Sequence, residues 1–311
     1  METPETPRER KSLPRTITPL TLPAASGVGL LRFPLKPPMV EDLVRSALQE
    51  DAAFNDLTTI ATVVSNRRSR ATLVARERAV VCGLPLALEA FRLLDAKATF
   101  RIEHEDGARV SAAQPVLFVT GHARGLLSAE RVALNYMQRL SGIATITSQY
   151  VDAVKGTNAK ILDTRKTTPG WRALEKYAVR AGGGTNHRMD LSTGILIKDN
   201  HLAALDGDVA KAVSRAREIA PKGVKIEVEC DNVEQVQRAA EAGADIILLD
   251  NMTVDTMAEC VKLVAGRAIL EASGGVTLAT VRKIAESGVD WISVGALTHS
   301  APSMDIGLDF D

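Results

Sequence analysis

The densest group of chemically capable side chains in this sequence lies between Lys160 and His201. The stretch holds eight Lys or Arg residues against four Asp or Glu residues, together with two of the five histidines, although the whole chain is neutral. Most of its chemically capable residues fall in three short runs, Asp163–Gly170, Ala181–Arg188 and Lys198–His201. Planar guanidinium groups bind a carboxylate or phosphate through two parallel hydrogen bonds, so several together suit a ligand with more than one anionic group. The sequence therefore predicts a site for a multiply charged anion.

The positions of four basic residues support this interpretation. Arg165 and Lys166 come directly after an expected strand, and Arg188 and Lys198 follow three consecutive glycines. A glycine backbone can turn tightly and present N–H groups to an anion. A solvated surface charge is a sufficient explanation for any one of these residues. Their grouping after the strands of one expected sheet favours the anion site.

Acidic residues end two neighbouring expected strands. Alternation along the segment Ile226–Glu229 sends Glu227 and Glu229 to one face and the apolar residues to the other. Asp250 ends the next apolar strand and supplies a third carboxylate. Because buried carboxylates without partners are costly, we expect these acids to bind a hydrated Mg²⁺ or sugar hydroxyls. The alternative is a structural network in which nearby lysines neutralise them.

Two glycine-bearing segments, Glu271–Thr277 and Ser293–Leu297, follow the last two strands expected in the barrel. Backbone N–H groups from loops at this place commonly hold a phosphate monoester. Each segment alone is a weak signal, since turns need glycine in any case. Together with the cationic and acidic groups, they fit phosphoribosyl pyrophosphate, which carries a 5′-phosphate, ribose hydroxyls and a pyrophosphate that binds Mg²⁺.

The elements that must position these residues fall into three parts. Residues 1–38 contain eight prolines without helical or strand periodicity and are expected to form a mobile extension. Residues 39–140 contain short β-rich runs and are expected to form an N-terminal α/β sandwich domain on an antiparallel sheet. Residues 141–311 alternate strands and helices, which predicts an incomplete α/β (TIM-like) barrel. We also allow for a helical return of the chain to the first domain near its C-terminus.

A helical stretch from Ser128 to about Val154 is expected to connect the two domains. In this stretch, Ser128 is the expected N-cap and Gly142 the expected break or bend between two helical segments. In the barrel, Asp231 and Thr253 are the expected N-caps of successive helices.

Composition excludes several classes of protein. Lys plus Arg and Asp plus Glu both number 38, so no net field draws the chain to nucleic acid or to an anionic membrane. Aromatic residues make up 4%, too few for a surface that stacks on successive bases. No apolar run reaches the roughly 18 residues needed to cross a bilayer. Cys82, Cys230 and Cys260 have no metal-ligand spacing, which predicts reduced thiols in a cytoplasmic protein.

Six motifs of the chain closely resemble those of quinolinate phosphoribosyltransferases, also called carboxylating nicotinate-nucleotide pyrophosphorylases. In family order they are Ala129–Asn135, Leu140–Thr145, Leu162–Gly170, Lys176–Arg180, Gly182–Arg188 and Ile197–His201. The resemblance implies a sandwich domain packed on an incomplete barrel, and a homodimer or an assembly of dimers whose partner subunits complete each site. Two departures stand out. Asn55 precedes Asp56 where the family usually has Gly, and residues 1–38 match nothing.

The resemblance also implies roles for individual residues. Arg165, His187, Arg188 and Lys198 would bind the carboxylates of quinolinate, and Arg131 would reach in from the partner subunit. Three residues would be catalytic: Lys166 at the phosphoribosyl donor, and Glu229 and Asp250 at the ribose and, through water, at Mg²⁺. The remaining residues predicted to bind substrate are Thr164, Glu227, Ser273, Gly274, Gly275, Gly295 and Ala296.

The implied reaction transfers phosphoribosyl from phosphoribosyl pyrophosphate to quinolinate with decarboxylation, giving nicotinate mononucleotide, pyrophosphate and CO2 in NAD biosynthesis. The nearest alternative is a related transferase acting on another pyridine or pyrrole carboxylate. A barrel lyase or isomerase that uses Lys166 or Lys198 as a Schiff-base amine, and a non-catalytic anion-binding protein, are further alternatives. His104, His122 and His299 belong to no motif and are expected to have ordinary surface or core roles.

Overall fold

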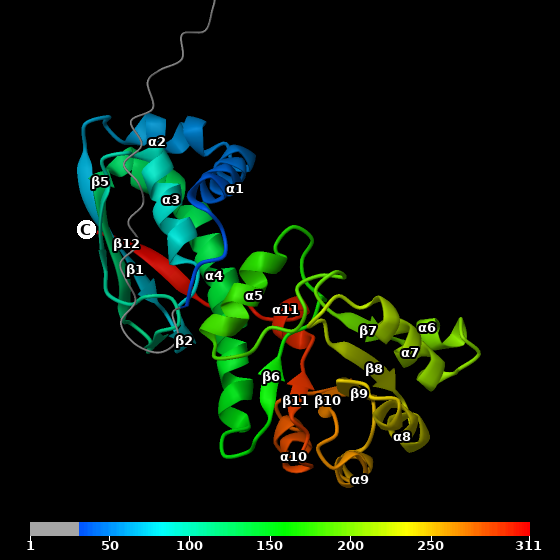
Figure 1. Cartoon of the computed structure of the whole chain (residues 1–311). Coiled ribbons are helices and arrows are strands. Elements are labelled where there is room, and N and C mark those ends of the chain that lie inside the picture. Colours follow the sequence, from blue (N-terminus) through cyan, green and yellow to red (C-terminus); the bar gives the residue numbers. More distant parts are fainter. Residues whose placement is uncertain (1–30) are drawn as a thin grey trace, which may run out of the picture. The chain divides into compact units, whose positions relative to one another are not determined.

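The computed structural model describes residues 31–311, which contain an antiparallel and a parallel sheet as predicted (Figure 1). Four strands form the sheet β12-β1-β5-β3, six form the sheet β6-β11-β10-β9-β8-β7, and β2 pairs with β4. Most of the predicted extension, residues 1–30, lies outside the described residues. The rest of it packs on the protein, since the Phe33 ring meets the Tyr177 ring edge-on with centroids 5.0 Å apart.

The N-terminal part combines an antiparallel sheet with helices. Its elements are α1 (Pro37–Glu50), η1 (Ala53–Asn55), α2 (Leu57–Thr62), β1 (Arg68–Ala75), β2 (Ala79–Val80), α3 (Leu84–Leu94), β3 (Thr99–Ile102), β4 (Arg109–Val110), β5 (Pro115–His122) and α4 (Ala123–Ala153). Leu73 and Leu117 pair across β1 and β5 and are fully buried, as is Phe91 of α3. The core of this part therefore lies between the sheet and the helices.

The C-terminal end of the chain returns to this first sheet as a strand and not as a helix. β12 (Ile306–Phe310) pairs antiparallel with β1, with Leu308 opposite Leu73 (Figure 1). Ile306 is buried and Asp309 is exposed. Exposure increases along the strand from Ile306 to Asp309 and Phe310, so its first residue contributes most to the core.

Helix α4 is continuous, which corrects two predictions. Ser128 does not cap a helix but lies five residues inside α4, where its hydroxyl donates to Asp56 Oδ2 at 3.0 Å. Gly142 does not break the helix. A Cβ atom at Gly142 would lie 1.8 Å from the carbonyl oxygen of Pro302, so the glycine allows a distant segment to pack directly against the helix.

Strands and helices alternate through the rest of the chain. The elements are β6 (Lys160–Leu162), α5 (Arg172–Ala181), β7 (Ile195–Ile197), α6 (Asp199–Ala203), α7 (Val209–Ile219), β8 (Ile226–Cys230), α8 (Val233–Glu241), β9 (Ile246–Asp250), α9 (Val254–Val264), β10 (Ile269–Ser273), α10 (Val281–Glu286), β11 (Trp291–Ser293) and α11 (Ala296–His299). All the pairings among these strands are parallel. The end strands β6 and β7 are not paired with each other among the described residues, so the predicted incomplete barrel is confirmed.

Of the N-caps predicted at Asp231 and Thr253, one is correct. Thr253 caps α9, as predicted, by accepting the Thr256 N–H at 3.2 Å. The N-cap of α8 is Asn232 and not Asp231, because the Asn232 side chain accepts the Gln235 N–H at 2.9 Å. Along residues 31–311, no helix is both long and apolar enough to span a bilayer.

Candidate active site

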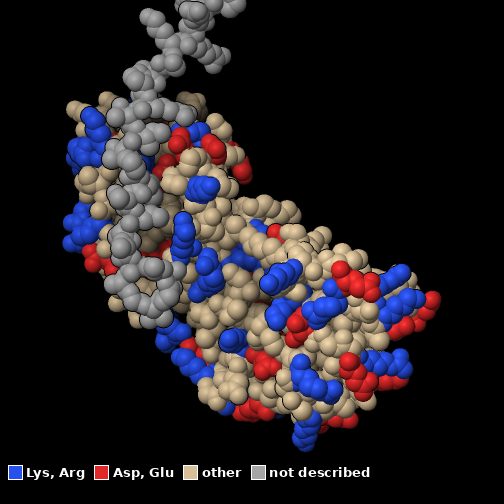
Figure 2. Space-filling model, in the orientation of Figure 1, with Lys and Arg blue, Asp and Glu red and all other residues tan. Residues whose placement is uncertain are grey.

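A cavity of about 820 Å³ opens at the carboxyl ends of the barrel strands. Every predicted site residue except Arg131 and Glu227 lines it. Those residues are Thr164, Arg165, Lys166, His187, Arg188, Lys198, Glu229, Asp250, Ser273, Gly274, Gly275, Gly295 and Ala296. Figure 2 shows positive and negative side chains interspersed on the visible face of the protein. The concentration of positive charge is therefore a property of this site and not of a whole face.

Strand register explains why side chains distant in sequence meet here. Glu229 lies opposite Leu248, and Leu248 lies opposite Glu271, so these three residues form one layer across β8, β9 and β10. Two residues further along β9, Asp250 lies opposite Ser273. Because side chains on a strand alternate, both layers point to the same face. The acidic residues thus reach the cavity floor and its rim.

Two guanidinium groups dominate the cationic side of the cavity. Nε of Arg165 is buried and has no hydrogen-bond partner among the described residues. The Arg188 side chain is held in place by the carbonyl of Gly194, which accepts a hydrogen bond from Nη1 at 2.9 Å. Burial first, and then repulsion by Arg165, lower the pKa of Arg188. Since an unpaired buried donor and two like charges are both costly, an anion bound between them would be stabilising.

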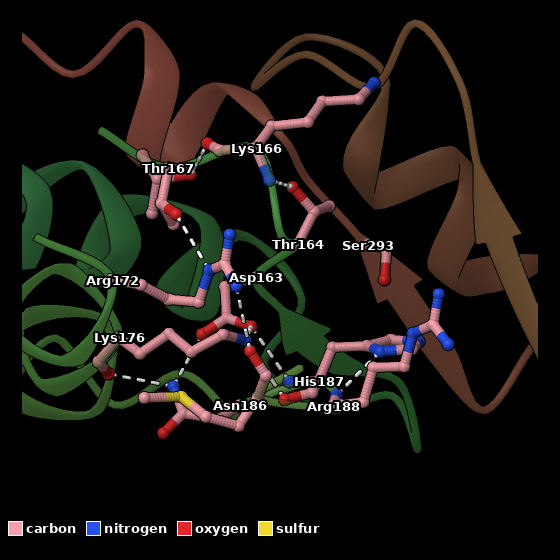
Figure 3. Close-up of polar contacts among 12 residues, drawn as sticks. Asp163, Thr164, Lys166, Thr167, Arg172, Lys176, Asn186, His187, Arg188 and Ser293 are labelled. Atoms are coloured by element: carbon pink, nitrogen blue, oxygen red, sulfur yellow. Dashed lines mark hydrogen bonds and ion pairs between the residues drawn. The ribbon is translucent and has the colours of Figure 1, made fainter. Parts of the chain in front are cut away.

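The backbone of this basic region is fixed by a buried ion pair that the sequence did not reveal (Figure 3). Lys176 of α5 bonds to Asp163, and both side chains are at most 3% exposed. Lys176 Nζ also donates to the carbonyl of His187 at 3.0 Å, and Asp163 accepts the His187 N–H at 2.9 Å and a side-chain hydrogen bond from Asn186. Asp163 and Lys176 are 13 positions apart, beyond any local pairing rule. They hold the loop that presents His187 and Arg188.

His187 joins two buried carboxylates, Glu271 at the cavity wall and Glu227 beneath it. Its Nε2 lies 3.2 Å from Glu227 and 3.4 Å from Glu271, while its Nδ1 accepts the Arg188 N–H at 2.7 Å. These three residues are close enough to hold a metal ion. A metal-binding histidine, however, offers one nitrogen to the metal and donates from the other. Here the second nitrogen is an acceptor, so the proton sits on Nε2 and the cluster is a hydrogen-bonded network.

The pKa values of His187 and Glu227 are both raised, so this cluster binds a proton tightly. Burial alone lowers the pKa of His187, but hydrogen bonds to Glu227 and Glu271 outweigh it and raise the pKa to about 10. A second ring proton on Nδ1 would face the Arg188 N–H, which already donates to this nitrogen at 2.7 Å. Burial also raises the pKa of Glu227, so the additional proton belongs to the cluster as a whole.

The acidic rim is tied to the basic region. Lys198 Nζ donates to Glu229 Oε2 at 3.0 Å, and Asn251 Nδ2 donates to Asp250 Oδ2 at 2.8 Å. Only one oxygen of each carboxylate takes part in these contacts within the described part of the chain. Both carboxylates line the cavity and are half-buried, and carboxylate oxygens at a partly hydrated site are the donors that Mg²⁺ prefers.

Glycines shape the remaining wall. Gly274 has φ +96°, and a Cβ there would lie 2.1 Å from the side chain of Asn251. A Cβ at Gly295 would meet the His299 ring at 3.1 Å and the Lys166 side chain at 3.3 Å. The backbone of both segments is therefore approached closely by other groups, and only glycine fits without displacement.

One predicted site residue, Glu227, does not line the cavity but lies below it in contact with His187. Arg131 lies exposed on α4, and its role in the cavity of a partner subunit stays a prediction. Conversely, Glu271 and His299 line the cavity, although the sequence assigned them no site role. The strand period could have revealed Glu271, which lies two residues before Ser273 on the same face of β10.

Comparisons with known proteins agree with this geometry. The family model described as "Quinolinate phosphoribosyl transferase, C-terminal domain" matches residues 143–309, and that of the N-terminal domain matches residues 56–141. The nicotinate-nucleotide pyrophosphorylase [carboxylating] of Mycobacterium leprae is 46% identical over 276 residues, which cover 86% of this chain and 96% of that protein.

Solved structures of two similar proteins share the fold. NadC from Streptococcus pyogenes has a TM-score of 0.84 at 42% identity, with 89% of this chain and 99% of that chain covered. The nicotinate-nucleotide pyrophosphorylase from Francisella tularensis has a TM-score of 0.84 at 37% identity, with 90% and 99% covered. This chain belongs to the quinolinate phosphoribosyl transferase family.

Proposed function

We propose that this protein transfers the phosphoribosyl group of phosphoribosyl pyrophosphate to quinolinate, releasing pyrophosphate and CO2 and forming nicotinate mononucleotide. One observation carries the proposal. Arg165, Arg188 and Lys198, which come from three separate loops, converge on a cavity that also contains Glu229 and Asp250. Such a cavity can hold a dianionic acceptor next to a sugar phosphate whose leaving group needs charge neutralisation.

The acceptor would occupy the basic side. Quinolinate carries two adjacent carboxylates, and the unpartnered buried Nε of Arg165 beside Arg188 is suited to one of them. Lys198 lies at the same cavity and would contact the other. Both ring nitrogens of His187 are already hydrogen-bonded, so His187 would act by holding the backbone of Arg188. We further propose a homodimer in which Arg131, exposed on α4, enters the cavity of the partner subunit. Light scattering would show a dimer, and Arg131→Ala would lower quinolinate affinity without changing the mass.

The donor would occupy the opposite wall. The glycines at 274, 275 and 295 would bind its 5′-phosphate through backbone N–H groups. Lys166, exposed at the rim, would bind the pyrophosphate. Glu229 and Asp250 would accept hydrogen bonds from the ribose and hold Mg²⁺, and the carboxylate donor set described above fits this ion. Bound Mg²⁺ would neutralise charge on the pyrophosphate.

The reaction proceeds by nucleophilic substitution followed by decarboxylation. The bond between C1 and pyrophosphate breaks with its electron pair leaving on oxygen, which Lys166 stabilises, while the pyridine nitrogen forms the new bond to C1. Glu229 and Asp250 stabilise positive charge that develops at C1. The quaternised ring then accepts the electron pair of the C2–carboxylate bond, CO2 departs, and C2 takes up a proton. Arg165 and Arg188 hold the substrate in place through both steps.

Isotope release tests the proposal directly. Quinolinate labelled in its C2 carboxyl group should release labelled CO2 only when phosphoribosyl pyrophosphate is present, with equimolar nicotinate mononucleotide. Removal of divalent metal with EDTA should abolish turnover, and Mg²⁺ should restore it. Preference for nicotinate or another pyridine acid in competition would identify a different transferase. Trapping of a substrate on lysine by borohydride would instead support a Schiff-base lyase.

We also propose that the protein is cytoplasmic. Its three cysteines are free and buried, as expected of a protein in a reducing compartment. Fractionation of cells with an antibody against the chain would test this assignment.

A further inference from the structure

A second charged pair lies behind the cavity and does not line it. Glu175 of α5 is fully buried, and its Oε1 accepts from Arg139 Nη2 of α4 at 2.9 Å. The same carboxylate accepts two hydrogen bonds from Thr168, at 2.9 Å from the hydroxyl and at 3.1 Å from the backbone N–H. Thr168 follows Arg165 and Lys166 by three and two positions. Glu175 therefore fixes the end of the loop that presents both side chains.

Arg139 extends this connection to the wall on the other side of the cavity. Its Nη1 donates to the carbonyl of Ala301 at 2.9 Å, and its Nη2 donates to the carbonyl of Thr298. The Thr298 hydroxyl donates in turn to the carbonyl of Lys166 at 2.7 Å. Thr298 follows Ala296 by two positions. One guanidinium thus binds the segment after the proposed phosphate loop, and also binds the carboxylate that holds the loop of Arg165 and Lys166.

The energetic cost of this arrangement points to a role beyond stability. Withdrawing two charges from water is costly, and an apolar pair of similar volume is often equally stabilising. Among the described residues, every acceptor or donor that the two side chains contact, apart from each other, lies in residues 163–171 or in residues 295–301, which include α11. These two segments carry groups that bind opposite ends of the proposed substrates. These contacts satisfy the remaining donors and acceptors of the buried pair, and they also tie the two segments to each other.

We infer that Arg139 and Glu175 are positioning residues, which hold the loop of Arg165 and Lys166 in register with the phosphate-binding segment of Gly295 and Ala296. This inference rests on the proposed function. It places neither residue in contact with substrate. Because reacting groups must be held to within a fraction of an ångström, a small displacement of one loop relative to the other should reduce turnover on the order of 100-fold.

The first test is Glu175→Gln with a matched control. Glutamine keeps one acceptor but replaces the other with an amide NH2, which must face either Arg139 or the Thr168 N–H. The control is Asp245→Asn at the amino end of β9, whose carboxylate likewise accepts from an arginine, Arg217, at 3.0 Å and from the N–H of Ile226 at 2.8 Å. Both variants should lose thermal stability. Only Glu175→Gln should raise the KM for quinolinate and phosphoribosyl pyrophosphate and lower kcat.

Two further variants test the inference if Glu175→Gln folds poorly. Thr168→Val removes one hydroxyl donor without exposing a buried charge, and it should lower kcat by roughly 10-fold. The double variant Arg139→Met/Glu175→Gln removes both charges, so it should recover melting temperature but not activity. Recovery of wild-type kcat and KM in the double variant would overturn the inference. Equal losses of activity in Asp245→Asn and Glu175→Gln at matched stability would do the same.

A binding measurement separates this inference from the proposed function. Calorimetric titration with quinolinate alone should show weaker binding to Glu175→Gln than to the wild-type protein or to Asp245→Asn. Absence of turnover in the wild-type protein would contradict the proposed function. Unchanged quinolinate affinity in Glu175→Gln would contradict the positioning role, whatever the turnover.

Discussion

Lys198 Nζ and Glu229 Oε2 are 3.0 Å apart across the neighbouring strand ends of β7 and β8. This contact joins a residue assigned to the acceptor with one assigned to the ribose and Mg²⁺. Lys198 is 47% exposed and Glu229 is 17% exposed, so the pair stands at the wall of the cavity. A ligand carboxylate that binds Lys198 would share its positive charge with Glu229, and the two substrate sites would thereby be coupled.

Replacement of Lys198 should therefore affect both substrates. Lys198→Met should raise the KM for quinolinate by about 10- to 100-fold, because a charge-assisted hydrogen bond is lost. It should also change the KM for phosphoribosyl pyrophosphate, since Glu229 loses its partner. Lys225→Met is the control, because Lys225 is exposed and pairs with Asp245 at the other end of the barrel at 3.4 Å. Steady-state kinetics with each substrate varied in turn would decide it, and an unchanged quinolinate KM would refute the assignment.

The sequence predicted the site well where it depends on strand ends. Alternating and apolar runs locate the barrel strands, and parallel strands bring their last residues to one edge, so Glu229 and Asp250 had to lie close together. The incomplete barrel followed from the same pattern. Register itself was not needed, because only the end of each strand mattered.

Contacts between segments distant in sequence could not be predicted. The Asp163–Lys176 pair depends on how α5 packs against β6, and no periodicity encodes that packing. From the sequence alone, Gly142 resembles a helix break. Glycine is needed there because Pro302, 160 positions further along the chain, packs closely against the helix. Arg131 stays a prediction, since its proposed role needs a second subunit.

Gly142 should be sensitive to the addition of one methyl group. Gly142→Ala places a Cβ 1.8 Å from the Pro302 carbonyl oxygen, so α4 and the C-terminal segment must separate. Overpacking of this kind costs about 1–3 kcal/mol in the free energy of unfolding, despite the higher helix propensity of alanine. Asn135→Ala, at an exposed position of the same helix, is the control and should have little effect. Denaturant titration measures both, and equal stability of the two variants would contradict the close contact.

The cluster of His187, Glu227 and Glu271 predicts a pH dependence of stability. The pKa of His187 is raised from 6.5 to about 10, so the folded protein binds this proton more tightly than the unfolded chain does. The resulting stabilisation is fully present below about pH 6.5 and is lost as the pH rises towards 10. Glu271→Gln removes one of the two acceptors and should make stability vary less with pH in this window.

Thermal melts of the wild-type protein and of Glu271→Gln between pH 6 and pH 10 would test this dependence. Glu259→Gln, at an exposed position of α9, is the control and should follow the wild-type profile. Parallel profiles for the wild-type protein and Glu271→Gln would show that the hydrogen bond to Glu271 does not raise the pKa of His187.

The glycine loop after β10 should separate donor binding from acceptor binding. Gly274→Ala adds a Cβ 2.1 Å from the Asn251 side chain at a residue with φ +96°. The loop must shift, so the KM for phosphoribosyl pyrophosphate should rise by roughly 10-fold or more, whereas calorimetric affinity for quinolinate alone should stay near the wild-type value. Gly266→Ala is a matched control, because Gly266 also has positive φ, +77°, but no atom within 4 Å of the added Cβ. Backbone strain alone would weaken both variants equally in stability and leave both kinetic profiles unchanged. A donor KM that rises only in Gly274→Ala would therefore locate the 5′-phosphate at this loop, and an unchanged donor KM would place it elsewhere.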